Sequence, residues 1–129
     1  MASAQNSLLI NSLNNQNEIS PDYYQNLFTR WTTDQNVLPD FPNLKSEQLV
    51  ALHFIMMAFE EKVEYTERQI DDGIIDRNIF SIDHIQIRVF LVTFGFLEKI
   101  FNQEKQIYHV SNKFLKHGNW NSSIPGIHN

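Results

Sequence analysis

The sequence predicts an all-α protein, an irregular bundle of four to five helices around one long central helix. One helix start is clear in "SPDYYQNLFTRW", where Ser20 can cap the helix and Pro21 suits its first turn. Aromatic residues and leucine then recur in this stretch at helical spacing. The central helix is expected over residues 46–72, because apolar residues recur there with the helical period and Gly73 follows as a natural C-terminal stop.

The central helix has two different halves. Its first half, "LVALHFIMMAF", is apolar on nearly every side, which is typical of a helix in the middle of a bundle or at an oligomer interface. Its second half carries acidic residues at spacings of four, three and four beside an apolar face. These carboxylates are Glu60, Glu64, Glu67 and Asp71. We expect them to form a solvated helix side, with a cation site or partner surface as the alternative.

The segment after Gly73 is the most ambiguous. Alternation in "IQIRV" and the β-branched residues around it favour a strand, whereas Asp76 as a cap and an apolar stripe favour a helix. We predict a helix over 77–92, because an isolated strand would lack a partner, and shorter helices through "FLEKIFNQ" and "SNKFLKHG". Residues 20–117 would then form a single helical domain. A polar, weakly helical or disordered segment (1–19) precedes it, and a flexible tail (118–129) follows.

Composition restricts the partners. The 129 residues carry a formal charge of −5 and no run of three Lys or Arg, so binding along a nucleic-acid backbone is not expected. The longest apolar stretch, "VFLVTFGFL", is far shorter than the roughly 20 residues of a membrane span, so no membrane insertion is expected. Cysteine is absent, which fits a reducing compartment. We therefore expect a cytoplasmic protein.

Four segments in order resemble a family of small bacterial all-helical proteins of unknown function. They are "SPDYYQNLFTRW", "AFEEKVEYTERQIDDGIID", "FLVTFGFLEKIF" and "IYHVSNKFL". Together they extend over roughly residues 20–117, and several members of the family carry an upstream membrane anchor. The resemblance implies a helical fold at residues 77–92 and implies no activity.

Candidate sites are few. Glu60 lies where the all-round apolar half of the central helix ends, so we predict a buried ion pair between Glu60 and Arg30 or Arg88. His53 lies on nearly the same helix side as Glu60 and is interpreted as a core residue, with ion binding or pH sensing as the alternative. The sequence has no nucleophile elbow, P-loop or Gly-rich dinucleotide turn, and its histidines lack zinc-site spacing. We therefore predict no enzyme activity, no cofactor and no metal.

These observations favour a non-catalytic protein-interaction or regulatory module. Its partner would be another protein or a second copy of the chain. The expected partner-binding residues are Phe54, Met57, Trp120 and Leu9. The alternative is a small-molecule or ion-binding sensor that uses His53 with Glu60, or a Phe-rich region. That region comprises Phe90, Phe94, Phe96 and Phe101.

Overall fold

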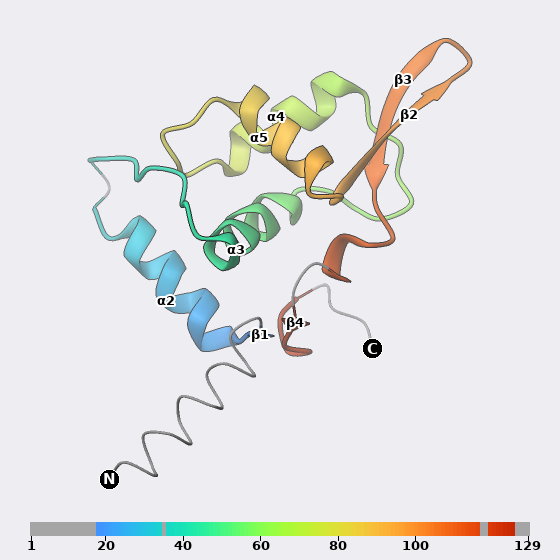
Figure 1. Ribbon diagram of the computed structural model, residues 1–129. Coiled ribbons are helices and arrows are strands. Elements are labelled where there is room, and N and C mark those ends of the chain that lie inside the picture. The colour runs from blue at the N-terminus through green and yellow to red at the C-terminus, as the bar shows by residue number, and fades with distance from the viewer. Residues whose placement is uncertain (1–17, 35, 117–118, 126–129) are drawn as a thin grey trace, which may run out of the picture.

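The computed structural model describes residues 18–34, 36–116 and 119–125. Within these residues the chain forms four α-helices, one antiparallel β-hairpin and a short parallel strand pair (Figure 1). The helices are α2 (Pro21–Thr32), α3 (Lys45–Met56), α4 (Glu67–Arg77) and α5 (His84–Thr93). The hairpin is β2 (Leu97–Asn102) with β3 (Lys105–Val110), the parallel pair is β1 (Glu18–Ile19) with β4 (Asn119–Trp120), and a 3₁₀ turn, η1, covers Phe114–Lys116. The prediction of an all-α fold is therefore wrong.

The single long helix predicted over 46–72 is also wrong, because the chain leaves the helix after Met56 and re-enters one at Glu67. A capping box starts the second helix. The Thr66 hydroxyl accepts a hydrogen bond from the Gln69 N–H at 3.1 Å, and the Gln69 side chain accepts one from the Thr66 N–H at 2.8 Å. The signal "TERQ" is present in the sequence, but the apolar periodicity running through it suggested a continuous helix.

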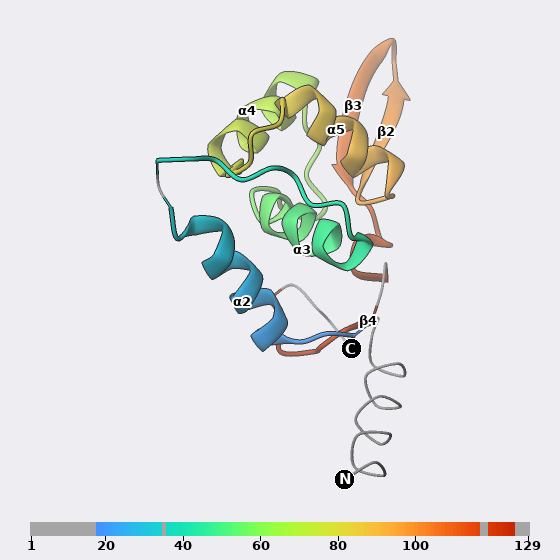
Figure 2. The same cartoon turned by 60° about the vertical axis from the view of Figure 1, so that its left-hand side comes forward.

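The apolar half of the predicted helix is central all the same. Helix α3 lies between α2 on one side and α4 with α5 on the other in both views (Figures 1 and 2). Its buried residues cover most directions around the helix axis. They are Leu49, Val50, Ala51, Leu52, His53, Ile55 and Met56. The excess of apolar surface that the sequence suggested is therefore largely covered by the chain itself.

Gly73 does not end a helix but lies inside α4. A Cβ atom at this position would lie 2.6 Å from Cε1 of the Phe59 ring, closer than carbon atoms can approach. The absence of a side chain therefore lets the buried Phe59, from the α3–α4 connection, pack directly on the α4 backbone. The glycine is explained by packing, not by helix termination.

Helix α5 begins at His84 and not at Arg77, because Asp83 is the residue that caps it. The Asp83 carboxylate accepts a hydrogen bond from the Ile85 N–H at 2.8 Å. A turn over residues 78–83, anchored by the buried Phe80, separates α4 from α5. The two helices and this turn have the order of a helix-turn-helix unit, with a connection of six residues.

The hairpin replaces the short helix predicted through "FLEKIFNQ". In the described part of "SNKFLKHG", which follows the hairpin, the 3₁₀ turn η1 is the only helical element. The register of the hairpin pairs Leu97 with Val110, Lys99 with Tyr108 and Asn102 with Lys105. The two-residue turn has positive φ at Gln103 (50°) and Glu104 (66°), the geometry of a tight hairpin. That turn usually contains glycine or asparagine at these positions, so its usual sequence signal is missing here.

A single residue outside the hairpin, Tyr65, pairs with the free side of β3. Tyr65, just before α4, forms an isolated antiparallel bridge with Tyr108, with both backbone hydrogen bonds at 2.8 Å. The order across the sheet is therefore Tyr65, β3, β2, and β2 lies at the outer edge. None of the helices in the described ranges is both long and apolar enough to cross a membrane.

Candidate binding surface

The outer side of α5 and the neighbouring β2 strand expose apolar side chains. Ile85 and Val89, one helical turn apart on α5, are 48% and 47% exposed, and Phe101 on β2 is 73% exposed. Lys99 and Phe101 share one side of β2 because they are two residues apart. We call this surface the α5–β2 face. It comprises Ile85, Val89, Val92, Thr93, Lys99 and Phe101.

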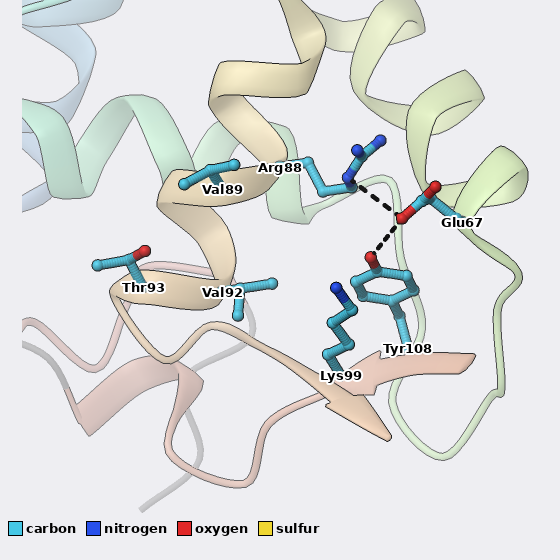
Figure 3. Close-up of a pocket in the computed structure, with 7 residues that line it drawn as sticks. All are labelled: Glu67, Arg88, Val89, Val92, Thr93, Lys99 and Tyr108. Carbon is cyan, nitrogen blue, oxygen red and sulfur yellow. Dashed lines mark hydrogen bonds and ion pairs between the residues drawn. The ribbon is translucent and has the colours of Figure 1, made fainter. Parts of the chain in front are cut away.

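A cavity of about 180 Å³ opens in the α5–β2 face, between α5 and the hairpin. Figure 3 shows Val89, Val92 and Thr93 on its α5 side and Lys99 with Tyr108 on its hairpin side. Glu67, the first residue of α4, and Arg88 of α5 close its far end (Figure 3). The cavity therefore combines an apolar helix wall with a polar, charged end.

The polar end is a connected network. The Tyr108 hydroxyl donates to Oε1 of Glu67 at 2.8 Å, and the Gln106 amide donates to the same oxygen at 3.2 Å. Arg88 Nε lies 3.7 Å from Glu67, while its Nη1 hydrogen-bonds Asp71. The hydrogen bond from Tyr108 and the charges of Arg88 and Lys99 hold the pKa of Glu67 below its ordinary value. Glu67 is thus an ionised acceptor at neutral pH.

Two other members of the network, Tyr108 and Arg88, keep their protons. Burial, followed by the hydrogen bond to Glu67, raises the pKa of Tyr108. Burial alone would lower the pKa of Arg88, but its hydrogen bond to Asp71 and the charges of Asp71 and Glu67 raise it. The network therefore has fixed protonation near pH 7, with a carboxylate, a phenol and a guanidinium.

The predicted ion pair between Glu60 and Arg30 or Arg88 is wrong. Arg30 pairs with Glu47 at 2.6 Å, and Arg88 pairs with Glu67 and Asp71. Glu60 is exposed, and its backbone N–H donates to the Tyr65 hydroxyl at 2.7 Å. The cause is the break between α3 and α4, which removes Glu60 from the helix that was expected to direct it inward.

The carboxylate ladder is divided by the same break. Glu60 and Glu64 lie outside the helices, whereas Glu67 and Asp71 remain one turn apart on α4 and share Arg88. Sequence reasoning missed this trio and Tyr108. The i, i+4 spacing of Glu67 and Asp71 was a visible signal for a shared cation, but nothing in the sequence indicated that Tyr108 would face them.

His53 lies on another side of α3 and is a core residue, with 1% of its surface exposed. Its Nε2 lies 3.0 Å from the Pro125 carbonyl, which can only accept, so Nε2 carries the proton. Nδ1 then accepts from the Tyr24 hydroxyl at 2.7 Å. Burial lowers the pKa of His53 to about 4. His53 and Glu60 are not brought together, and no cluster of His, Asp and Glu in the described ranges could hold a metal ion.

The residues expected to bind a partner have contacts within the chain. Phe54 is half-buried between Phe28, with ring centroids 4.9 Å apart, and Arg77, whose guanidinium lies 4.1 Å from the ring. Trp120, in β4, packs 5.0 Å from His53, and Met57 is half-buried at the end of α3. Leu9 lies outside the described residues. A partner role for these four residues stays a prediction.

The Phe-rich region does not form one pocket. Phe96 is fully buried against Phe114, and Phe90 stacks on Phe41 at 5.2 Å. Phe94 lies between them, 6.2 Å from each of Phe90 and Phe96. Phe101 is separate and exposed on the hairpin. Three of the four residues are thus part of a packed aromatic series, and the fourth belongs to the α5–β2 face.

The segment from α3 to β3 has a distinctive order of elements. Three helices, with a bridging residue after the first and a hairpin after the third, have the order of a winged helix-turn-helix domain, in which the hairpin is the wing. Residues 37–110, from the loop before α3 to the end of β3, match the family model described as "Uncharacterized protein conserved in bacteria (DUF2087)". The chain belongs to this family, which confirms the predicted relationship to an uncharacterised bacterial family. No curated protein and no solved structure matches the chain.

Proposed function

We propose that this protein is a non-catalytic interaction module that binds a protein partner on its α5–β2 face. The observation that carries the proposal is the exposure of Ile85 and Val89 on α5 and of Phe101 on β2, together with the cavity that Val89 lines between the helix and the wing. Exposed apolar residues that gather on one face, rimmed by polar groups, are typical of protein-binding surfaces. The second helix of a helix-turn-helix is also the element that such domains present to their targets.

Charge favours a protein over DNA as that target. The matched segment 37–110 contains seven Lys or Arg and twelve Asp or Glu, a net charge of −5. The one arginine of α5, Arg88, is engaged by Glu67 and Asp71. A helix that reads the major groove needs free cations for phosphates and polar side chains for base edges. Two of the four exposed positions of α5 are apolar, Ile85 and Val89, and the other two, Gln86 and Thr93, are polar but uncharged.

Catalysis and small-molecule sensing have less support. A general base works best with a pKa near the operating pH, and the pKa values of Glu67 and Tyr108 are shifted away from neutrality in opposite directions. The cavity of about 180 Å³ is smaller than the roughly 300–1,000 Å³ of typical ligand pockets. It is large enough to receive one or two side chains of a protein partner.

The test is a quantitative affinity capture from a lysate of the native bacterium, analysed by mass spectrometry. Three forms of the full chain are compared: wild type, Val89→Glu and Val37→Glu. Val37 is a matched control because it is an exposed valine, 63% accessible, in the loop before α3. We expect one or more proteins to be retained by wild type and Val37→Glu and lost with Val89→Glu. Equal retention by all three forms would contradict the proposal.

A further inference from the structure

The outer edge of β2 has backbone groups available for pairing. Tyr108 directs its N–H and C=O to Tyr65, away from β2, and Lys99 is directly opposite Tyr108 in the register. In an antiparallel pair, the backbone N–H and C=O groups of two opposite residues either bond to each other or both point away from the partner strand. The N–H and C=O of Lys99 therefore point away from β3, toward the outside of the sheet. The backbone N–H and C=O of Phe101, two residues later in β2, also point outward. Within the described residues, no backbone hydrogen bond reaches either of them from outside the hairpin.

This free edge adjoins the cavity. Lys99 lines the cavity opposite Val89 and Val92 (Figure 3), so a strand added to β2 would project alternate side chains toward these valines. Addition of a strand to an exposed edge is a common mode of peptide binding, in which the main chain supplies affinity and pockets for alternate side chains supply specificity. An exposed strand edge next to exposed apolar residues is suited to that mode.

The charges indicate which peptide fits. Lys99 has no ion pair within 4 Å in the described residues, while the other cation of the cavity, Arg88, is paired twice. Glu67 already accepts from Tyr108 and Gln106. The cation left to meet a ligand charge is therefore Lys99, and directly opposite residues of opposite charge stabilise a strand pair.

A second copy of the chain fits this edge less well. Two β2 strands paired antiparallel about Lys99 would place two ammonium groups directly opposite each other. The next register would leave them as diagonal neighbours on the same side of the sheet. Like charges at such positions destabilise a strand pair. A heterologous strand with a carboxylate at this position has the opposite effect.

We propose that the α5–β2 face binds an extended peptide segment that pairs antiparallel with β2, with a carboxylate opposite Lys99 and apolar side chains two residues before and after it. This inference rests on the proposed function and names its ligand class. The flanking apolar residues would contact Phe101 on one side and the valines of the cavity on the other. Antiparallel pairing is chosen because it is the more stable arrangement per residue.

The test uses a blocked synthetic peptide, Thr-Val-Thr-Asp-Thr-Val-Thr, added to the ¹⁵N-labelled full chain and followed by NMR. We expect shifts at the amides of Lys99 and Phe101 and at Val89 of α5. Replacing the peptide Asp by Lys should weaken binding about tenfold, since an attraction becomes a repulsion. Methylating the nitrogens of the Asp and of both Val residues should abolish binding, because those N–H groups face β2.

A charge exchange provides the sharpest control. Lys99→Glu should bind the Asp peptide about tenfold more weakly than wild type does and should bind the Lys peptide at least as well as wild type binds the Asp peptide, and Lys99→Gln should bind both peptides about equally. Unchanged affinity for the Asp peptide in Lys99→Glu, or undiminished binding of the methylated peptide, would overturn the inference. The inference would also be overturned if wild type self-associated with rising concentration and Lys99→Glu did not. The edge of β2 would then pair with a second copy of the chain. If no peptide binds but a protein is still captured by wild type and lost with Val89→Glu, the extended-peptide ligand is refuted. The proposal of an interaction module would be unaffected by that result.

Discussion

Two tyrosine hydroxyls, on different sides of α3, form hydrogen bonds in opposite surroundings. Tyr24 of α2 donates to His53, which is buried and neutral, is stacked on the Phe114 ring and also contacts the tilted Trp120 ring. Tyr108 of β3 donates to Glu67, an ionised carboxylate whose side chain is 47% exposed at the edge of a cavity. One hydroxyl satisfies a core group, whereas the other orders a charged group that water still reaches.

The region around His53 and the region around Glu67 differ in their role in the protein. The His53 side joins residues distant in sequence, since His53 contacts Tyr24 before it and Pro125 after it. Loss of a partner there leaves a buried polar atom without a hydrogen bond, which is costly. The Glu67 side leaves an open cavity, exposed apolar residues and a strand edge next to it. We infer that the first region stabilises the fold and the second is available for binding.

The largest effect on stability is expected for His53→Ala. The substitution removes two hydrogen bonds and the ring stacked on Phe114, and it leaves a cavity and an unsatisfied Tyr24 hydroxyl. We expect a loss of about 3 kcal/mol in the free energy of unfolding, measured by urea denaturation at pH 7. His84→Ala, at the start of α5, is the control and should change it by about 0.5 kcal/mol or less. Similar values for both variants would contradict a core role for His53.

Acid should weaken the fold through the same residue. The folded pKa of His53 is about 4, below the ordinary 6.5, so between these values the unfolded chain binds a proton that the folded chain does not. Stability therefore falls as the pH falls through this window, by about 2 kcal/mol at pH 5 relative to pH 8. The difference between wild type and His53→Ala, followed by urea titration across pH 4–8, isolates this contribution. A constant difference would show that His53 is protonated equally in both states.

Matched removal of the two hydroxyls compares the regions directly. Tyr24→Phe leaves the buried Nδ1 of His53 without a donor, and we expect a loss of about 1–2 kcal/mol. Tyr108→Phe removes the hydroxyl between Glu67 and Gln106, but water still reaches Glu67 and Arg88 stays beside it, so we expect a smaller loss of about 0.5–1 kcal/mol. Thermal and urea unfolding of both variants provide the measurement. A larger loss for Tyr108→Phe would reverse the assignment of roles.

The smallest effect on stability is expected at the binding face. Val89→Glu places a charge on the exposed side of α5 and replaces a β-branched residue with a better helix former. We expect a change of about 0.5 kcal/mol or less in the free energy of unfolding, checked by urea denaturation, together with the loss of the captured partner. Substantial unfolding of Val89→Glu would instead place the valine in the core.

Local signals in the sequence predicted some elements well. The Ser20 cap and Pro21 mark the start of α2 as the structure has it, and the apolar pattern of α3 correctly indicated a central helix. Both signals depend on neighbouring residues, which a sequence displays. The end of α3 was harder to predict, because neither proline nor a glycine stop follows it. The apolar periodicity continues through the α3–α4 connection.

The hairpin and the site could not be predicted for a physical reason. Strand pairing joins Lys99 to Tyr108 and Tyr108 to Tyr65, contacts that local periodicity does not report. The turn at Gln103 and Glu104 adopts positive φ without glycine. Because β2 was expected as a helix and β3 was not expected as a strand, Tyr108 could not be placed beside Glu67, and Phe101 was grouped with the other residues of the Phe-rich region. The α5–β2 face therefore depends on one tertiary feature that the sequence leaves unmarked.

Amide hydrogen exchange of the unbound full chain shows directly whether the outer edge of β2 is free to pair. The N–H groups of Ile100 and Tyr108 are paired within the sheet, to β3 and Tyr65 respectively, so they should exchange slowly. The N–H groups of Lys99 and Phe101 point outward and should exchange rapidly, with protection appearing only when the Asp peptide is bound. Slow exchange of Lys99 and Phe101 in the unbound chain, equal to that of Tyr108, would show that the edge is already covered and would contradict the account.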